Sequence, residues 1–458
     1  MIMGKENRDI KPLLFLFFIN ALGISILLVN GWNNVAYDIA IRSTVICMMS
    51  MFAYFVINRF KLGDPYLFII AALLSTIGVI MLSRIYETMR ENSKILDEFS
   101  VSLGTTQMVW FIIGALIYFA VILLYRAFSK LLPKMTLFFY GVAMFLFLIT
   151  LLFGTGPSGS GVKNWVELGP VSVQPSEFIK ILLILAFAAV LSKNNDMGIG
   201  WIGRKTNLYN PDTASEKKKK WAGLFLTTFI FASFAGGLIL QREFGTMLLF
   251  GVLYIAFLYA FGESKIYLVG NIILAGVAVV AGGALLKLLA PESFNLIMDR
   301  INAWWDPLVD PSGTSYQVVR SLIAIGEGRY SGVGIGNGSP GYIPECQNDS
   351  IFAVICEEIG LMGGIAVLML YFLLVYRGFK VALTTTNRFN KAVAFGISVV
   401  LGIQTFIIVG GITALIPLTG ITLPFISAGG SSMISMFIMI GILQAISSMK
   451  GETTDELE

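Results

Sequence analysis

Histidine is absent from the sequence, and both charge and cysteine are scarce. Without histidine, the chain has no Ser-His-Asp nucleophile, no histidine general base and no histidine-ligated metal. The three cysteines are Cys47, Cys346 and Cys356, and they imply no disulfide framework. Cys47 and Cys356 fall in or beside apolar runs, while Cys346 has no evident partner. The candidate acids and bases are therefore carboxylates.

Charged residues make up 13% of the 458 residues, hydrophobic residues make up 56%, and the mean hydropathy is +0.80. The apolar residues form runs of about 18 to 25, the length of a helix that crosses a bilayer. These runs are apolar on every face, whereas the strands of a membrane β-barrel alternate in polarity over about ten residues. The sequence predicts an all-α, polytopic helical membrane protein. About twelve spans are expected, near 12–30, 44–58, 65–85, 107–125, 135–153, 174–192, 221–240, 244–262, 265–290, 349–376, 390–414 and 426–448.

Lysine and arginine gather in alternate loops, which predicts the loops that face the cytoplasm. Both termini are then cytoplasmic, and residues 154–173, 291–348 and 415–424 lie outside. The lysine run at 217–220 is an orientation determinant that is also compatible with contact to anionic membrane lipids. The net charge of +4 follows from these loops and does not indicate nucleic acid binding. The long first span lacks a clear cleavage site and is expected to remain as an anchor.

The predicted outer loop is rich in carboxylates, including Asp306, Asp310 and Glu345, with Asp349 directly after it. Proline follows both Asp306 and Asp310, which disfavours helix and favours a turn that holds the carboxylates at fixed angles. Ordinary turn formation also explains these residues. The glycine run at 332–341 likewise fits a flexible loop, because it does not meet the spacing of a nucleotide-binding loop in context.

Three smaller groups lie near the predicted outer ends of spans. Glu177 and Lys180 are three residues apart, so they share a helix face and can pair at a depth where either charge alone would be unfavourable. Such a pair is either functional or purely structural. Arg242 and Glu243 mark a tight turn between two spans. The small residues at 428–430 are best explained by close helix packing.

Four long motifs occur in a fixed order along the chain. They are G-x-x-x-W-x-x-L-G-P-x-x-x-Q-P-S-E-x-x-K from Gly161 to Lys180, D-P-x-x-D-P-x-G-x-x-Y-Q from Asp306, Y-I-P-E-x-x-x-D-x-I-F-A-V-I-x-E-E-x-G from Tyr342 to Gly360, and P-L-T-G-I-T-L-P-F-I-S-x-G-G-S-S from Pro417. Together they resemble the SEDS family of shape, elongation, division and sporulation proteins, which includes FtsW, RodA and SpoVE. The resemblance covers roughly 63–450, the expected ten-span core. It leaves an N-terminal extension at 1–62 with two spans and a cytoplasmic tail at 451–458.

The resemblance implies a peptidoglycan glycosyltransferase that polymerises lipid II on the outer face of the bacterial cytoplasmic membrane. It also implies a partner, a monofunctional class B penicillin-binding protein that acts as the transpeptidase. The family's catalytic carboxylate, which takes the proton of the acceptor hydroxyl, resembles Asp310, with Asp306 in reserve. Cations are expected to stabilise the polyprenyl diphosphate as it leaves. The site residues implied besides these aspartates are Lys180, Arg242 and Arg320 as cations, Glu177 to orient Lys180, and Tyr316, Gln317, Glu345, Asp349, Ser431 and Ser432 as substrate-binding residues.

The chain departs from the family pattern at Arg242 and Glu243, where the family often has Pro-Asp. The sequence predicts no metal site, but a divalent cation such as magnesium or manganese stays open, because carboxylates such as Asp310 and Asp349 could hold one through water. Trp304 and Trp305 are expected to be interfacial anchors. Two alternatives remain: a lipid II flippase, since ionisable residues in spans are typical of carriers, and a non-catalytic scaffold for the transpeptidase.

Overall fold

The computed structural model describes residues 11–29, 33–92, 102–156, 163–169, 171–191, 216–261, 265–289 and 291–449. Each of the twelve predicted spans coincides with one long helix, so the all-α membrane fold is confirmed. These helices are α1 (Lys11–Val29), α2 (Asn33–Arg59), α3 (Tyr66–Asn92), α4 (Leu103–Phe128), α5 (Thr136–Phe153), α6 (Ser176–Leu191), α8 (Glu216–Leu240), α9 (Phe244–Phe261), α10 (Lys265–Leu289), α13 (Ile351–Thr384), α14 (Arg388–Ile412) and α15 (Gly430–Ser448).

Ten of the described helices are long and apolar enough to cross a bilayer by themselves. The other two are α6, with 16 residues, and α1, whose described apolar stretch is Leu16–Ser25. Helices suit the bilayer because every backbone N–H and C=O is bonded within the segment. Large apolar side chains such as Phe52, Leu123 and Phe145 stay exposed on the flanks of the bundle, which is where lipid tails would contact them.

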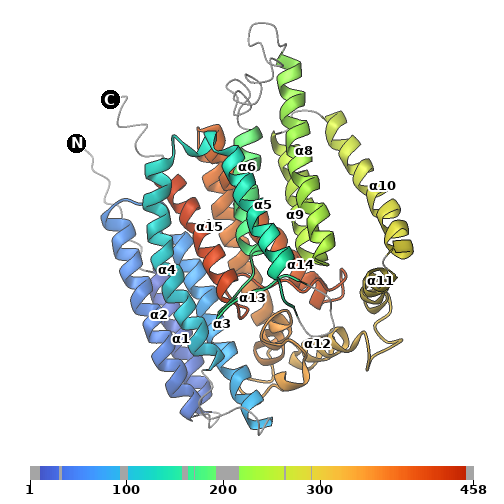
Figure 1. Ribbon diagram of the computed structural model, residues 1–458. Helices are drawn as coiled ribbons and strands as arrows, with labels where there is room; N and C mark the ends of the chain where they lie inside the picture. The colour runs from blue at the N-terminus through green and yellow to red at the C-terminus, as the bar shows by residue number, and fades with distance from the viewer. Residues whose placement is uncertain are drawn as a thin grey trace, which may run out of the picture.

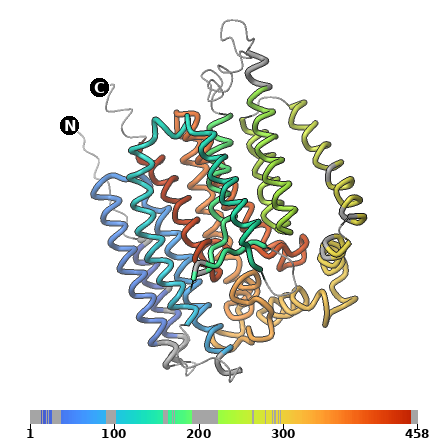
Figure 2. The backbone as a smooth tube through the Cα atoms, viewed as in Figure 1, coloured from blue at the N-terminus to red at the C-terminus, as the bar shows by residue number. Residues whose placement is uncertain are grey.

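The helices form one bundle around α3, α14 and α15, whose side chains are mostly buried. Helix α15 packs against α4, α14 and α6, while α13 packs against α14 and α3. The first two helices cover one flank of this core by packing against each other and against α3 (Figure 1). On the opposite flank, α10 stands at the edge of the bundle beyond α8 and α9 (Figure 2).

The predicted outer loop 291–348 contains helices that the apolar runs did not reveal. They are α11 (Pro291–Trp305), α12 (Tyr316–Gly328) and the single-turn η2 (Pro340–Tyr342); another single turn, η1 (Leu132–Lys134), precedes α5. Both α11 and α12 are short and amphipathic, so neither produces a long apolar run. They lie across one end of the bundle, which is called here the loop end (Figure 1).

A small antiparallel hairpin also lies at the loop end. Strand β1 (Val166–Leu168) pairs with β2 (Val171–Val173), with Val166 opposite Val173 and Leu168 opposite Val171. A further bridge joins Thr155 to Trp165. These bonds bring the end of α5 beside the start of α6 and fix the hairpin at the loop end.

The spanning helix α13 is broken where the glycine-rich loop meets it. Gly360 has φ 82° and ψ 174°, so the helix loses its internal bonds there. The loop supplies replacements: Gly334 N donates to the Glu358 carbonyl, and Leu361 N donates to the Arg329 carbonyl. The glycine-rich loop, which the sequence suggested could be flexible, is thus attached to α13 by backbone hydrogen bonds.

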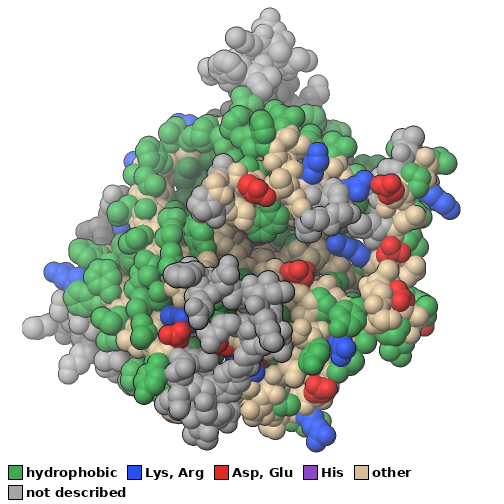
Figure 3. Space-filling view, turned by 60° about the horizontal axis from the view of Figure 1, so that its bottom comes forward, with side chains coloured by type: hydrophobic (Ala, Val, Ile, Leu, Met, Phe, Trp, Pro, Cys, Tyr) green, Lys and Arg blue, Asp and Glu red, His purple; other side chains and the backbone are tan. Residues whose placement is uncertain are grey.

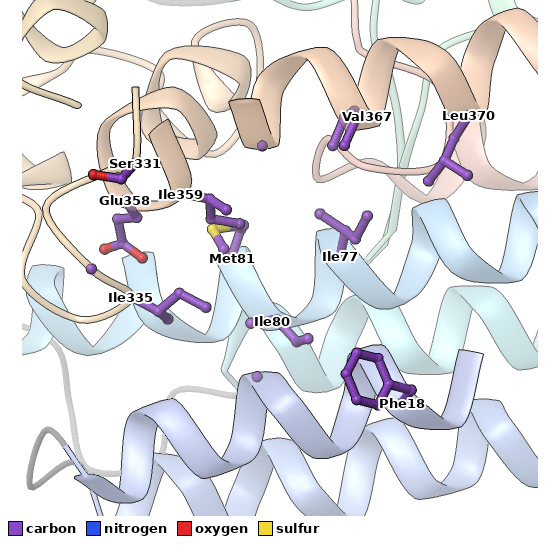
Figure 4. Close-up of a pocket in the computed structure, with 14 residues that line it drawn as sticks. Phe18, Ile77, Ile80, Met81, Ser331, Ile335, Glu358, Ile359, Val367 and Leu370 are labelled. Carbon is purple, nitrogen blue, oxygen red and sulfur yellow. The ribbon is translucent and has the colours of Figure 1, made fainter. Parts of the chain in front are cut away.

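A buried arginine fastens the same loop to α3. Arg84 Nη2 donates to the carbonyls of Gly336 and Gly338, at 2.7 and 3.2 Å. Its Nε lies 3.4 Å from Oε1 of Glu358, whose carboxylate points toward α3 in Figure 4. The loop continues from this attachment to Glu345 and Asp349.

Candidate functional site

A cavity of about 590 Å³ lies at the loop end of the bundle. Its walls come from α4, the β1–β2 hairpin, the turn between α8 and α9, α11, the 345–349 segment and the segment between α14 and α15. Figure 3 looks onto this end and shows acidic and basic side chains gathered around a hollow, beside a flank of hydrophobic side chains. Segments far apart in sequence thus form one polar cavity next to the apolar bundle.

Two arginines line the cavity. Arg242 lies in the turn between α8 and α9, and Arg300 projects from α11, where its Nη1 is 3.5 Å from the Thr419 carbonyl. Burial lowers the pKa of Arg300, and the charge of Asp349 opposes this effect. Two guanidinium groups in one partly enclosed cavity are suited to binding an anion with several oxygens.

Glu345 and Asp349 face the same cavity. The pKa of Asp349 is raised to about 7, mainly by burial and also by the nearby Glu345, while Arg300 opposes both effects. Asp349 therefore changes charge near neutral pH, unlike an ordinary surface aspartate. The neighbouring Asn348 is held by Glu345 through a 2.7 Å hydrogen bond from its Nδ2.

Glu243 lies in the cavity wall and is almost fully buried. Its Oε1 accepts three hydrogen bonds, from Gln174 Nε2 at 2.8 Å, Ser176 Oγ at 2.9 Å and Thr246 Oγ1 at 2.8 Å. Its Oε2 is buried without a hydrogen-bond partner among the described residues. One side of this carboxylate is thus fixed, and the other is unsatisfied.

The predicted ion pair between Glu177 and Lys180 is confirmed as a contact, with Lys180 Nζ 2.5 Å from Glu177 Oε2. Lys180 is 1% exposed and does not line the cavity. It reaches the wall indirectly, because its Nζ donates to Gln404 Oε1 at 3.1 Å and Gln404 Nε2 donates to the Thr422 carbonyl at 2.9 Å. Ser435 Oγ also donates to Glu177, at 2.6 Å. The pair is thus linked to the cavity wall through Gln404 without facing the cavity.

Aromatic and amide side chains form another part of the lining. Trp110 from α4 and Trp165 from the hairpin lie there with Asn164 and Asn348. Gly430 packs directly on Trp110, since an added Cβ would lie 2.3 Å from the indole ring. The close-packing interpretation of 428–430 therefore holds at Gly430. Indole faces beside hydrogen-bonding amides are suited to a sugar, which has both apolar C–H faces and hydroxyl groups.

Asp310 does not line the cavity in this conformation. It lies in the turn between α11 and α12, where Oδ2 accepts hydrogen bonds from the Thr314 backbone at 2.8 Å and from the Thr314 hydroxyl at 3.1 Å. These bonds lower the pKa of Asp310. Asp306 lies in the same turn, and its Oδ1 accepts from Leu308 N at 3.2 Å. The turn predicted from the two Asp-Pro pairs is present.

The remaining predicted residues do not line the cavity. Arg320 lies over the rings of Tyr316 and Tyr342, with its guanidinium carbon 5.2 and 5.7 Å from their centroids. Gln317 Nε2 donates to Ser350 Oγ at 3.0 Å, which connects α12 to the start of α13. These contacts tie the Asp310 turn to the segment that carries Asp349.

Ser431 and Ser432 lie at the start of α15. Ser431 Oγ accepts from Gln174 N at 3.1 Å, and Ser432 Oγ accepts from Thr422 Oγ1 at 2.8 Å. Both hydroxyls thus join neighbouring wall segments to each other.

Trp304 and Trp305, both expected to be interfacial anchors, have different surroundings in the structure. Trp304 Nε1 donates to the Ala414 carbonyl at 3.1 Å, whereas Trp305 is 80% exposed.

The described residues contain no group of three or more Asp, Glu or Cys side chains placed to hold a metal ion. Two carboxylates, Glu345 and Asp349, line the cavity together, and proteins commonly hold Mg²⁺ through one or two carboxylates with water completing its six oxygen ligands. All three cysteines are free and buried.

Sequence reasoning did not assign roles to Arg300, Gln404 or Trp110. Arg300 is one of several charged residues in the sequence of the predicted loop, and the amphipathic α11 that carries it has no long apolar run. Gln404 and Trp110 lie within apolar spans, so only the packing of distant helices reveals their positions. The sequence does place Gln404 inside an apolar span, and a polar residue at such a position indicates a functional or structural contact.

A second cavity, of about 370 Å³, lies within the helical bundle between α1, α3 and α13. Figure 4 shows its mainly apolar lining, including Phe18, Ile77, Ile80 and Val367, with Glu358 and Ser331 at one end. The cavity is apolar apart from that end, so it offers little chemistry. The loop-end cavity is the candidate functional site.

The chain matches the family of cell cycle proteins FtsW, RodA and SpoVE over residues 64–452. It is 31% identical over 444 residues to the peptidoglycan glycosyltransferase RodA of Mycobacterium tuberculosis, covering 97% of this chain and 90% of that protein. It is also 31% identical to stage V sporulation protein E of Bacillus subtilis over 390 residues, which is 84% of this chain and 96% of that protein.

Solved structures share the fold. One, described under structural coordination of polymerization and crosslinking by a peptidoglycan synthase complex, matches with a TM-score of 0.63 and 24% identity, covering 85% of this chain and 98% of that one. The rod shape determining protein RodA of Thermus thermophilus matches with a TM-score of 0.55 and 22% identity, covering 84% and 96%. The matched family and the spanning helices identify a multi-pass bacterial membrane protein. The chain therefore belongs to the FtsW, RodA and SpoVE family.

Proposed function

We propose that the protein is a peptidoglycan glycosyltransferase that polymerises lipid II into glycan strands. The observation that carries the proposal is the loop-end cavity, where Arg242 and Arg300 lie together with carboxylates and tryptophans. Lipid II combines a disaccharide, a diphosphate and a polyprenyl chain, so a polar cavity beside an apolar bundle suits all three parts. Relatives that match almost the whole chain carry the name peptidoglycan glycosyltransferase.

The diphosphate is assigned to the arginine side of the cavity. As the glycosidic bond forms, the polyprenyl diphosphate leaves with increasing negative charge. Arg242 and Arg300 stabilise that charge in a site partly shielded from water, where such interactions are strongest. Lys180 contributes at longer range through Gln404, because it is buried behind the wall.

The acceptor hydroxyl must lose its proton as it attacks the donor sugar. We assign this role to Asp310, by resemblance to the family's catalytic carboxylate. A positioned base of this kind contributes typically about 10²–10⁴ in rate. Because Oδ2 of Asp310 is bonded to Thr314, the proposal requires the turn between α11 and α12 to release the carboxylate toward the cavity when substrate binds.

The cavity is proposed to face the outside of the cytoplasmic membrane, with both termini in the cytoplasm. The distribution of lysine and arginine supports this orientation. A class B penicillin-binding protein is proposed as the partner, supported by the fold shared with a chain from a peptidoglycan synthase complex. The transpeptidase would cross-link the strands that this protein makes.

Glycan-chain formation from labelled lipid II tests the proposal. The purified protein is assayed alone and with a class B penicillin-binding protein, as wild type, Asp310→Asn and Asp306→Asn. Polymer is expected from wild type and Asp306→Asn, but not from Asp310→Asn. Asp306→Asn is a matched control, because it changes an aspartate of the same turn. No polymer from folded wild type with the partner present would favour transport or scaffolding.

A further inference from the structure

Glu243 combines three features that ordinary wall residues lack. It lines the cavity, it is 7% exposed, and its two carboxylate oxygens differ completely in their bonding. Oε1 accepts hydrogen bonds from three side chains, whereas Oε2 has no hydrogen-bond partner in the described part of the chain. Buried polar atoms in native proteins are almost always bonded, so an orphaned acceptor at a binding cavity points to a ligand.

The surrounding cations do not account for Oε2. Lys180 is near enough to act on Glu243 electrostatically, but its Nζ donates hydrogen bonds to Glu177 and Gln404 instead. Leaving a buried acceptor unbonded is unfavourable, more so when it is charged. A donor from outside the chain would satisfy it.

The backbone holds Glu243 firmly at this position. Arg242 has φ 59°, a left-handed conformation that is unfavourable for a residue with a side chain. Glu243 N donates to the Leu238 carbonyl at 2.9 Å. Gly245 approaches the next wall segment closely, since an added Cβ would lie 2.5 Å from the Thr419 carbonyl. The unfavourable turn is thus held in place by its neighbours.

We propose that Glu243 is a substrate-positioning residue whose Oε2 accepts a hydrogen bond from a hydroxyl or amide N–H group on the sugar part of the substrate. The assignment rests on the proposed function. A carboxylate repels a diphosphate, so Glu243 marks the sugar side of the cavity and the two arginines mark the diphosphate side. The chain has Glu where the family often has Asp, so this contact reaches farther from the turn.

Glu243→Gln tests the contact directly. The three donors around Oε1 hold the carbonyl oxygen of the new amide on their side, so its NH2 group occupies the place of Oε2. The substitution therefore exchanges an acceptor for a donor with almost no change in shape. Glu243→Asp keeps the charge but is one methylene shorter, and it should restore part of the binding.

Two probes separate the sugar from the rest of the substrate. Binding of lipid II and of polyprenyl diphosphate, which has no sugar, is followed by the fluorescence of tryptophans that include Trp110 and Trp165 in the cavity lining. Glu243→Gln should weaken lipid II binding by about ten- to a hundredfold, the effect of losing a hydrogen bond to a charged group. Polyprenyl diphosphate should bind the variant at least as tightly as wild type, because the substitution removes a negative charge from the cavity.

Thr246→Val is the matched control, since it removes one donor to Oε1 while leaving Oε2 in place. It should weaken lipid II binding much less than Glu243→Gln does. Equal weakening of both probes by Glu243→Gln would overturn the assignment, because it would show a general effect on fold or charge. Unchanged binding of both probes would overturn it as well.

Binding and turnover are measured separately, so the two proposals can fail independently. Lipid II binding that depends on Glu243 in a protein that forms no polymer would overturn the glycosyltransferase proposal and support the sugar contact. Polymer formation with no effect of Glu243→Gln would do the reverse. If Glu243→Gln melts well below wild type, Glu243→Asp carries the comparison between the two probes.

Discussion

Lys180 Nζ lies 2.5 Å from Glu177 Oε2, across one turn of α6, and both side chains are buried. Lys180→Met should destabilise the protein by roughly 3–5 kcal/mol, because it leaves a buried carboxylate without its counter-charge. Thermal melting of the purified protein measures the effect. The double variant Glu177→Gln with Lys180→Met should recover much of the loss. Equal melting temperatures for wild type and Lys180→Met would contradict this role.

Asp349 should make anion binding depend on pH near neutrality. Its pKa is about 7, mainly because it is buried, so its negative charge develops as the pH rises through that value. Ionised Asp349 partly neutralises Arg300, and polyprenyl diphosphate affinity should fall across that range relative to Asp349→Asn. Titrating both proteins between about pH 5 and about pH 9 isolates the contribution of Asp349, because changes in the ligand's own charge affect both.

Neighbouring charges should move this transition in opposite directions. Glu345 raises the pKa of Asp349, so Glu345→Gln should lower the midpoint; Arg300 lowers it, so Arg300→Gln should raise it. Stability follows the same linkage: the native state keeps a proton that the unfolded chain loses above about pH 4, so this contribution is largest at low pH and is lost as the pH rises through about 7. A midpoint that stays fixed in both variants would rule out Asp349 as the titrating group.

Arg242 can be tested without disturbing its turn. Glycine tolerates a φ of 59°, so Arg242→Gly should melt at or slightly above the wild-type temperature while losing the guanidinium. Polyprenyl diphosphate affinity should fall by about tenfold or more, as expected for a charged hydrogen bond. Arg242→Lys should retain part of it. Proline, frequent here in the family, is fixed near φ −65° and should break this turn. Unchanged diphosphate binding in Arg242→Gly would exclude Arg242 as a ligand.

The parts that could be predicted from sequence were those set by local chemistry. Long apolar runs gave the twelve helices, and the three-residue spacing gave the contact between Glu177 and Lys180. The amphipathic α11 and α12 were not identified, because their apolar residues cover only one face. The three donors around Glu243 and the position of Arg300 depend on segments that are distant in sequence. No local pattern encodes such contacts.

The orientation of the Asp310 carboxylate could not be predicted from sequence, although its turn could. The two Asp-Pro pairs predicted its turn, and the motif implied its role, but its carboxylate is bonded to Thr314 rather than facing the cavity. Whether a loop residue reaches a site depends on the conformations that the whole loop adopts with substrate. Sequence motifs identify the residue without determining that conformation.

Gly332 brings the glycine-rich loop into close contact with the backbone of α13. Gly332 has φ 80°, and an added Cβ would lie 2.2 Å from the Glu358 carbonyl oxygen. Gly332→Ala should therefore separate the loop from the broken turn of α13, lower the melting temperature and reduce polymer formation, because the same loop leads to Glu345 and Asp349. The cost of the unfavourable φ alone is roughly 1–2 kcal/mol.

Gly326→Ala is the matched control for this variant. Gly326 lies within α12, where no atom is within 4 Å of an added Cβ, so alanine should be tolerated or slightly stabilising. Melting curves and polymer assays on the two variants should then diverge, although their sites lie only six residues apart. If both variants behaved like wild type, the close backbone contact between Gly332 and α13 would not be needed to hold the loop, and the positions of Glu345 and Asp349 would have to be set by other contacts, such as the hydrogen bond from Ser427 to the Asn348 carbonyl.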